Sequence, residues 1–333
     1  MRLQSWFRRL WSGQAGFLGL VIGAVLLPLE WIYQGVVGLR NRAYDLGVLT
    51  SVASPIPVIS VGNLAVGGTG KTPFAGWLVT RLAEMGRRPA LVTRGYGSDE
   101  ALLHRLWNPD AIVVVDAQRA RGVALAAERG ADVAVLDDAF QHRSVQRDLD
   151  IVLVAAEHGV SRALLPRGRL RETVWSLERA DAIVMTRKVA DGEEAAGISA
   201  QLPGRGVRAQ VLFEAVEWVD LGGGPLSAPA DQKLLAVTSV ADPTPFCEMV
   251  RTQTSGDTES LAFPDHQEFS KHDVGRIVRA ANGRSVVTTE KDAVKLKAFS
   301  ETLPTTFVLR LRLVWEVGLD PVMGLIGRAL EAS

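Results

Sequence analysis

The chain has 333 residues, and its 37 lysines and arginines balance its 37 aspartates and glutamates, so the formal net charge is zero. This length is sufficient for two domains, and the lack of a basic excess argues against a nucleic-acid partner. The single cysteine, Cys247, excludes a disulfide framework and a cysteine-based zinc site. We expect Cys247 to be a small packed residue.

The N-terminal region predicts a membrane-associated helix. Residues 10–29 carry no charge; arginines lie on both sides of this stretch (Arg2, Arg8, Arg9, Arg40 and Arg42) and aromatic residues lie near its edges (Trp6, Trp11, Trp31 and Tyr33). This arrangement suits a segment in the membrane interface. The strictly apolar part, 17–29, is shorter than the roughly 20 residues of a full span, and Pro28 and Glu30 interrupt it. Spanning and lying flat both remain open, and a buried core helix is the alternative.

After this segment, short apolar runs alternate with helix-patterned stretches such as 74–85 and 121–129. Runs rich in β-branched residues with little polar alternation indicate strands covered on both faces, and repeated strand–helix units indicate a parallel sheet. A Pro/Gly-rich stretch at 221–229 predicts a boundary. We therefore expect an anchor over 1–42, a nucleotide-binding domain over 43–225 and a smaller α/β domain over 226–333. The expected strands are 57–62, 90–93, 111–115, 133–136, 151–155, 182–185, 234–238, 260–263, 286–289 and 306–311.

The sequence VISVGNLAVGGTGKTP, residues 58–73, has the order of a phosphate-binding loop: a strand, a glycine-rich turn, and then a helix. Glycines at 67, 68 and 70 allow backbone N–H groups to face an anion, and the N-terminus of the following helix adds positive potential. Lys71 would reach the β- and γ-phosphates, and the Thr72 hydroxyl would bind Mg²⁺. The common pattern has a glycine five residues before Gly70, where this chain has Ala65.

Three pairs of polar residues carry the remaining chemistry. Asp137 and Asp138 follow an apolar strand, a position that holds Mg²⁺ near a phosphate loop, and Gln141 and His142 lie in the same turn. The pairs Asp99-Glu100 and Asp265-His266 offer a carboxylate and an imidazole, which together could accept the proton of a hydroxyl under phosphorylation. Each pair alone is also compatible with a solvated turn or a helix N-terminus.

Six motifs, in this order, resemble those of the tetraacyldisaccharide 4′-kinases, enzymes of the lipid A pathway in Gram-negative bacteria: GNLAVGGTGKTP, RGYG, DDAFQH, LPRGRLRE, FPDHQEF and TEKDAVK. The resemblance runs from about residue 43 to about residue 297. It implies transfer of the ATP γ-phosphate to the 4′-hydroxyl of a tetraacylated glucosamine disaccharide 1-phosphate, giving lipid IVA. It also implies a P-loop-kinase-like parallel sheet domain with a smaller α/β domain, at the cytoplasmic face of the inner membrane, with membrane lipid as a partner.

The resemblance also implies roles for individual residues. Residues of the glycine-rich loop would bind ATP, with Thr72 also on Mg²⁺ (Gly67, Gly68, Thr69, Gly70, Lys71 and Thr72). Acidic residues would complete the metal environment (Glu100, Asp137 and Asp138). Asp99 with His266 resembles the base dyad, and Lys71 is the third catalytic candidate. Four further residues would line the site, the arginines being suited to phosphate (Gln141, His142, Arg119 and Arg171).

The chain departs from the family in two places. About twenty family residues are missing between RGYG and the acids, so Asp99 and Glu100 are either the shortened counterpart of the family's acid pair or unrelated to it. We expect the first, because Leu102, Leu103 and a strand follow. Ala139 stands where the family has glycine, and a left-handed backbone there would cost about 1 kcal/mol or more.

Two other functions use the same loop. A membrane-tethered P-loop NTPase acting as a regulatory switch would need a water-positioning residue but no base for an acceptor. A non-catalytic ATP-binding scaffold would follow if the shortened segment before Asp99 had destroyed the site.

Overall fold

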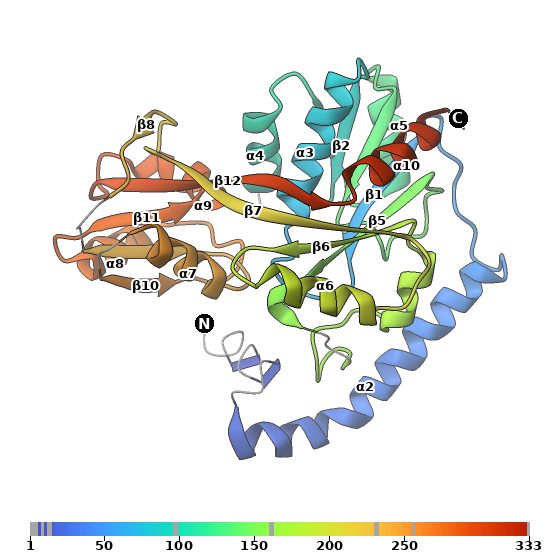
Figure 1. Ribbon diagram of the computed structural model, residues 1–333, viewed down its shortest axis with the longest axis horizontal. Helices are drawn as coiled ribbons and strands as arrows, with labels where there is room; N and C mark the ends of the chain where they lie inside the picture. Colours follow the sequence, from blue (N-terminus) through green and yellow to red (C-terminus); the bar gives the residue numbers. More distant parts are fainter. Residues whose placement is uncertain are drawn as a thin grey trace. The chain divides into compact units, whose positions relative to one another are not determined.

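The computed structural model describes residues 6–7, 10–11, 15–95, 99–159, 163–229, 233–254 and 257–331 (Figure 1). Arg2, Arg8 and Arg9, and Tyr96 and Gly97 of the RGYG motif, lie outside the described residues.

The described chain forms two compact units, and neither is continuous in sequence. The first contains residues up to Arg94, Asn108–Val211 and the segment from Trp315 onward; the second contains Gly95–Trp107 and Leu212–Val314. The members of each unit come from distant parts of the sequence. In the second unit α4 (Asp99–Trp107) packs against α9 (Glu290–Leu296), and in the first α10 (Leu319–Glu331) packs against β1 and β5. The expected domain bounds stay a prediction.

The first unit contains a parallel sheet with the strand order β6-β5-β1-β4-β2-β3. All six strands expected here are present, and the side chains of five of them are almost all buried, as in parallel sheets covered on both faces. The sixth, the edge strand β3, is partly exposed. Helices α3 (Lys71–Glu84), α5 (Arg119–Glu128) and α6 (Gly192–Gln201) pack against it. The strands are β1 (Val58–Asn63), β2 (Pro89–Thr93), β3 (Ile112–Val115), β4 (Val133–Asp137), β5 (Leu149–Ala155) and β6 (Ala182–Arg187).

The second unit contains the parallel strands β10 (Thr258–Ala262), β9 (Leu234–Thr238), β11 (Ser285–Thr289) and β12 (Thr306–Val317), in that order. Helices α7 (Thr244–Gln253) and α8 (Lys271–Ala281) belong to this unit, as α4 and α9 do. Cys247 of α7 is buried in the core beside Phe246 and Met249, which confirms its expected packing role.

Two strands were not expected from the sequence: β7 (Val207–Val219) and the short β8 (Pro225–Leu226), which pair antiparallel. The second half of β7 carries charged residues at 214 and 217, so it lacks the apolar run of a two-sided buried strand. These charged residues pair with arginines that are far away in sequence: Arg312 donates to Glu214 at 3.0 Å, and Arg310 donates to Glu217 at 2.5 Å.

The N-terminal helix α2 runs without interruption over Gly16–Asp45, so Pro28 and Glu30 interrupt the apolar run but not the helix. A proline inside a helix removes one backbone hydrogen bond and bends the axis rather than ending it, and the bend of α2 is visible in Figure 1. Most of its apolar side chains are exposed, Phe17 to 82 %. The alternative of a buried core helix is therefore wrong. By length and composition, α2 is the helix of the described chain that could cross a membrane.

One face of the second half of α2 is attached to the first unit. The buried Glu30 carboxylate accepts hydrogen bonds from the backbone N–H of Leu164, at 2.7 Å, and from the Arg167 side chain. The Tyr33 hydroxyl donates to the carbonyl of Arg171 at 3.0 Å. Tyr33 thus points into the protein, contrary to the expectation that it lies at a membrane edge, whereas the neighbouring Trp31 is exposed.

Candidate active site

The glycine-rich loop connects β1 to α3, as the sequence predicted. Gly67 and Gly70 both have positive φ (130° and 82°), and Gly70 is the N-cap of α3. A side chain at either position would strain the backbone. Helix α3 therefore begins directly after Gly70. The N–H groups of its first turn lie at the end of the glycine-rich loop, in the arrangement that binds phosphate in other proteins.

The carbonyl groups of this loop are held by side chains at the end of β6. The Thr186 hydroxyl donates to the carbonyl of Thr69 at 3.0 Å, and the Lys188 ammonium donates to that of Gly68 at 2.9 Å. Because the peptide between Thr69 and Gly70 is trans, the N–H of Gly70 points away from Thr186. The buried Asn63 amide also donates to the Thr69 hydroxyl, at 2.8 Å. Sequence reasoning missed all three anchoring side chains.

The start of the loop explains why Ala65 can replace the usual glycine. Ala65 forms an isolated antiparallel bridge with Leu170, and the N–H of Val66 donates to the carbonyl of Arg169 at 2.8 Å. This extended pairing with the LPRGRLRE motif suits any residue with a side chain, so no left-handed conformation is needed there.

Lys71 and Asp138 come together as the sequence predicted, with Lys71 Nζ 3.6 Å from Asp138 Oδ1. Arg171 Nη1 lies 2.7 Å from the same oxygen and 3.3 Å from Gln141 Oε1. Burial alone would raise the pKa of Asp138, but the charges of Lys71 and Arg171 outweigh it and lower that pKa to about 2. Asp138 is therefore a carboxylate at neutral pH, enclosed by two cations.

The turn that carries these acids is shaped by Asp138 itself, which has φ +52°. Ala139 is absent from the positive-φ residues of the described chain, and its side chain is fully buried in the core. Alanine in place of the family's glycine therefore causes no left-handed strain. A left-handed aspartate next to a phosphate loop is typical of a functional turn.

The other residues expected here stabilise the turn through its backbone. Arg119, almost fully buried, donates to the carbonyls of Asp137 at 3.0 Å and Asp116 at 2.9 Å. The Gln141 amide donates to the carbonyl of Asn63 at 2.9 Å. Burial, followed by the positive charges of Arg119 and Arg94, lowers the pKa of His142 to about 4, so this imidazole is neutral at pH 7.

In the second unit, Asp99 and His266 are in contact although they are far apart in sequence. Asp99 is completely buried at the start of α4, and its Oδ1 lies 3.1 Å from His266 Nδ1. His266 Nε2 lies 3.9 Å from Glu100 Oε1. Burial would raise the pKa of Asp99, but the hydrogen bond from His266 and the charges of Lys291 and Lys295 lower it well below the ordinary range. His266 has φ +56°, a second left-handed site residue.

Two lysines of the TEKDAVK motif, to which the sequence assigned no role, complete this cluster. Lys295 Nζ lies 3.2 Å from Asp99 Oδ2, and Lys291 Nζ lies 3.2 Å from His266 Nε2. Both come from α9, which packs against α4. The motif was visible in the sequence, but its position relative to Asp99 was not.

The described residues contain no group of three or more His, Cys, Asp or Glu side chains that would hold a metal by themselves. Mg²⁺ bound with a nucleotide needs few protein ligands, because phosphate oxygens and water supply the rest. Within the first unit, a hydroxyl at the start of α3 and the carboxylates at the end of β4 are the hard oxygen donors that Mg²⁺ prefers. The pKa of Asp138, at about 2, keeps that donor ionised. The donor set of Thr72, Asp137 and Asp138 therefore fits the ion.

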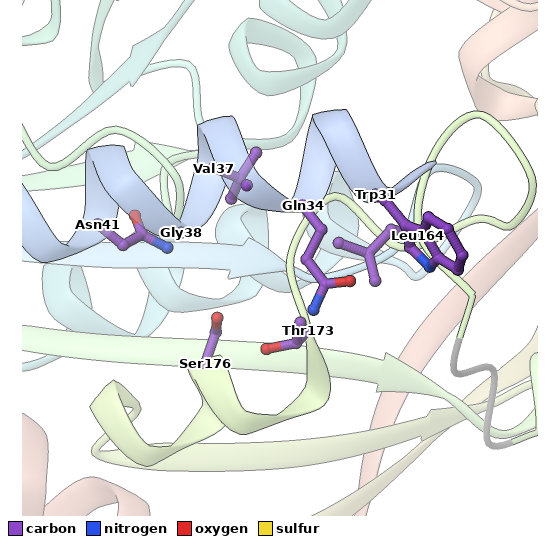
Figure 2. Close-up of a pocket in the computed structure, with 9 residues that line it drawn as sticks. Trp31, Gln34, Val37, Gly38, Asn41, Leu164, Thr173 and Ser176 are labelled. Atoms are coloured by element: carbon purple, nitrogen blue, oxygen red, sulfur yellow. The ribbon is translucent and has the colours of Figure 1, made fainter. Parts of the chain in front are cut away.

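A separate cavity of about 410 Å³ lies between the second half of α2 and the segment from Leu164 to Ser176 (Figure 2). Trp31 and Leu164 lie at one end, and the polar side chains of Gln34, Thr173 and Ser176 line its middle. It therefore combines polar groups with the neighbouring exposed apolar face of α2.

A parallel sheet whose first strand leads through a glycine-rich loop into a helix defines a P-loop kinase-like α/β protein. A family model described as Tetraacyldisaccharide-1-P 4′-kinase matches residues 22–106 and 97–323. The chain belongs to this family.

Individual relatives agree with this assignment. The chain is 37 % identical over 332 residues to the tetraacyldisaccharide 4′-kinase of Syntrophotalea carbinolica, covering 91 % of each chain. It is 36 % identical over 311 residues to that of Chlorobium luteolum, covering 83 % of this chain and 87 % of the relative. Among solved structures, LpxK from Aquifex aeolicus in complex with ATP matches with a TM-score of 0.74 and 27 % identity, over 93 % of this chain and 99 % of that one.

Proposed function

We propose that this protein transfers the γ-phosphate of ATP to the 4′-hydroxyl of a tetraacyldisaccharide 1-phosphate, giving lipid IVA. Membership of the family supports the reaction, and the observation that carries it is the ion pair of Lys71 with Asp138 beside the N-terminus of α3. In the reaction, a bond forms between the 4′-oxygen and the γ-phosphorus. The bond to the bridging oxygen breaks, and ADP leaves.

In the first unit, the proposed task is to hold the triphosphate. Backbone N–H groups of Gly67–Gly70 and the start of α3 bind its oxygens, with Lys71 on the β- and γ-phosphates. Thr72, Asp137 and Asp138 would hold Mg²⁺, and when bound the ion neutralises charge on the phosphates. Glu100, which the sequence also suggested as a metal ligand, belongs to the second unit. Arg171 orients Asp138 through their 2.7 Å contact. Charge stabilisation and positioning account for most of the catalysis in such reactions.

In the second unit, Asp99 and His266 would accept the proton of the acceptor hydroxyl. The 3.1 Å contact between their side chains supports Asp99 as the shortened counterpart of the family's acid. His266 is 27 % exposed and Asp99 is fully enclosed, so the pair presents its imidazole to a substrate. In this arrangement the carboxylate orients the histidine, and the histidine acts as the base.

We infer that α2 holds the protein at the cytoplasmic side of the inner membrane, where an acylated acceptor and cytosolic ATP meet. The exposed apolar residues of α2 support membrane contact. Its second half is attached to the protein along one face, through Glu30 and Tyr33. This favours a helix lying in the interface, at least for that half. The cavity beside α2, with polar groups next to an apolar face, suits part of an amphiphilic acceptor.

The alternative, a membrane-tethered regulatory NTPase, predicts hydrolysis without need for Asp99 and His266. Purified protein is incubated with [γ-³²P]ATP and lipid disaccharide, and label on the lipid and free phosphate are both measured. For wild type we expect labelled lipid; for Asp99→Ala and His266→Ala we expect label on the lipid to fall by about 10²- to 10⁴-fold, with slow ATP hydrolysis retained. No lipid label from wild type that binds ATP would refute the kinase.

A further inference from the structure

Two glycines of α2 help to keep the cavity beside this helix open. Gly35 and Gly38 lie three residues apart, and therefore on one face of the helix, and both line the cavity. A Cβ at either position would meet no atom within 4 Å. Close packing thus does not require glycine here, although glycine weakens the interior of a helix. The space beneath them is a feature in its own right.

Uncharged polar side chains line the cavity from both sides, two from α2 and two from the facing segment (Gln34 and Asn41; Thr173 and Ser176). Figure 2 shows the Gln34 side chain directed toward Thr173. Within the part of the chain that the structure describes, none of these four side chains makes a hydrogen bond, and Asn41 Oδ1 is fully buried. Buried polar groups are normally paired, so these four side chains are suited to a ligand.

The lining indicates the chemistry of that ligand. None of the described residues that line the cavity is charged, so the cavity lacks the cation that phosphate recognition uses. Side-chain amides and hydroxyls can each donate and accept hydrogen bonds. They therefore suit an uncharged group with a carbonyl acceptor, such as an amide or an ester. The volume of about 410 Å³ lies within the roughly 300–1,000 Å³ of small-ligand sites.

An apolar surface continues from the cavity along α2. Ile32 and Leu39 lie three residues before and four residues after Gly35, so their side chains flank this glycine on the helix surface. Both are exposed. A hydrocarbon chain that left the cavity past Gly35 would therefore lie against exposed apolar side chains.

The cavity also adjoins residues of the candidate active site within the first unit. The Tyr33 hydroxyl donates to the carbonyl of Arg171, whose side chain binds the acid turn, and Thr173 of the cavity is only two residues further along the chain. Nearer the end of α2, the Arg40 side chain donates to the carbonyl of Gln141 at 2.7 Å. A ligand in this cavity would thus lie beside the segments that carry the phosphate-site residues.

We propose that this cavity holds one acyl linkage of the acceptor. The amide or ester group that joins an acyl chain to the sugar binds to the four polar side chains, and the chain follows the apolar side of α2. This inference rests on the proposed function and specifies it, because it assigns the acyl linkage, rather than the 1-phosphate, to this site. No bond forms or breaks here; the cavity contributes binding and placement of the acceptor.

The main test fills the cavity in the full-length protein. Gly38→Leu introduces a side chain into open space, and Gly23→Leu makes the same change on α2, also with nothing within 4 Å, at a position that does not line the cavity. With lipid disaccharide in detergent micelles, we expect Gly38→Leu to raise KM for the lipid about 10- to 100-fold through lost hydrogen bonds. Its kcat and KM for ATP should not change, and Gly23→Leu should match wild type.

A second variant removes chemistry rather than space. Thr173→Val deletes one hydroxyl with little change of shape, and its expected effect is a rise of about 3- to 10-fold in KM for the lipid. Thr252→Val, at an exposed helix position, is the matched control. If Gly38→Leu does not fold, this pair of variants decides.

A disaccharide 1-phosphate without acyl groups separates ligand recognition from a structural effect. Its phosphorylation, measured as kcat/KM at high enzyme concentration, should be equal in wild type and Gly38→Leu, because the part that enters the cavity is absent. A defect of the same size with this substrate would contradict the inference.

An unchanged KM for the acylated lipid in Gly38→Leu would overturn the inference. If ordinary membrane phospholipid occupies the cavity instead, mass spectrometry should find phospholipid extracted with wild type but not with Gly38→Leu, while KM for the acceptor stays the same. That result would also contradict it. Failure of the proposed function is distinct, since it would appear as absence of lipid label from the wild-type protein itself.

Discussion

Lys71 and Asp138 form an ion pair, with Nζ 3.6 Å from Oδ1, at the point where the glycine-rich loop meets the turn after β4. The register between β1 and β4 pairs Val61 with Asp137, so the loop that follows β1 and the turn that follows β4 leave the same edge of the sheet. Ligands of parallel sheets bind at this edge. The pair therefore places the proposed phosphate-binding cation and the proposed metal-binding anion side by side.

Loss of the Thr186 hydroxyl should weaken ATP binding, because it leaves the Thr69 carbonyl without the donor that orients the loop. An unpaired buried carbonyl costs about 1–3 kcal/mol, and for Thr186→Val we expect KM for ATP to rise about tenfold with a smaller change in kcat. Thr252→Val, at an exposed helix position, is the matched control. An unaltered KM in Thr186→Val would show that the loop holds its shape without β6.

Gly62→Ala should destabilise the first unit. A Cβ at Gly62 would lie 2.5 Å from Phe140 Cβ and 2.6 Å from its backbone nitrogen, so β1 and the acid turn would have to separate. Such overpacking costs about 1–3 kcal/mol, measurable as a lower Tm. Gly197→Ala in α6, where nothing lies within 4 Å, should instead raise stability by about 0.5–1 kcal/mol. Equal Tm shifts for both variants would contradict the close approach.

His142 should make stability depend on pH below neutrality. Its pKa is about 4 in the folded protein and about 6.5 when unfolded, so between these values the unfolded chain binds more protons. Stability contributed by this group is therefore full above pH 6.5 and falls as the pH drops toward 4. His142→Asn should show a smaller decrease in Tm between pH 7 and pH 5 than wild type. The same decrease in both proteins would mean that His142 titrates normally.

Charges on the exposed side of α2 should release the protein from membranes. Leu20 and Val25 are exposed, and a lysine in an apolar helix centre costs about 2.5–3.5 kcal/mol each in lipid. We expect the Leu20→Lys/Val25→Lys variant to move to the soluble fraction on ultracentrifugation. Val278→Lys in α8 should fractionate as wild type. Retention of the double variant with the membranes would argue against burial of this face in lipid.

The fold was largely predictable because most of its strands are short apolar runs with mostly buried side chains, and all ten expected strands are present. The sequence did not predict β7, whose charged half finds partners on β12, about a hundred residues away. The attachment of the second half of α2 to the rest of the first unit was also not predicted, because its contacts, such as that of Glu30 with Leu164, join distant segments.

For the candidate site, residue types and order predicted which residues matter but not how they meet. The position of Asp138 near Lys71 followed from strand ends on one edge of a parallel sheet. The contact of Asp99 with His266 had no such local rule and came from the family resemblance. The sequence predicted no role for Lys291 and Lys295, because a lysine on a short helix is usually solvated. Only the packing of α9 on α4 makes them part of the cluster.

The central claim is that the loop around Lys71 binds a triphosphate, and calorimetric titration with ATP and Mg²⁺ tests it most directly. We expect wild type to bind, Lys71→Met to bind about 10- to 100-fold more weakly through loss of a charge-assisted contact, and the surface variant Lys297→Met to bind as wild type. Binding to Lys71→Met with wild-type affinity would contradict the account.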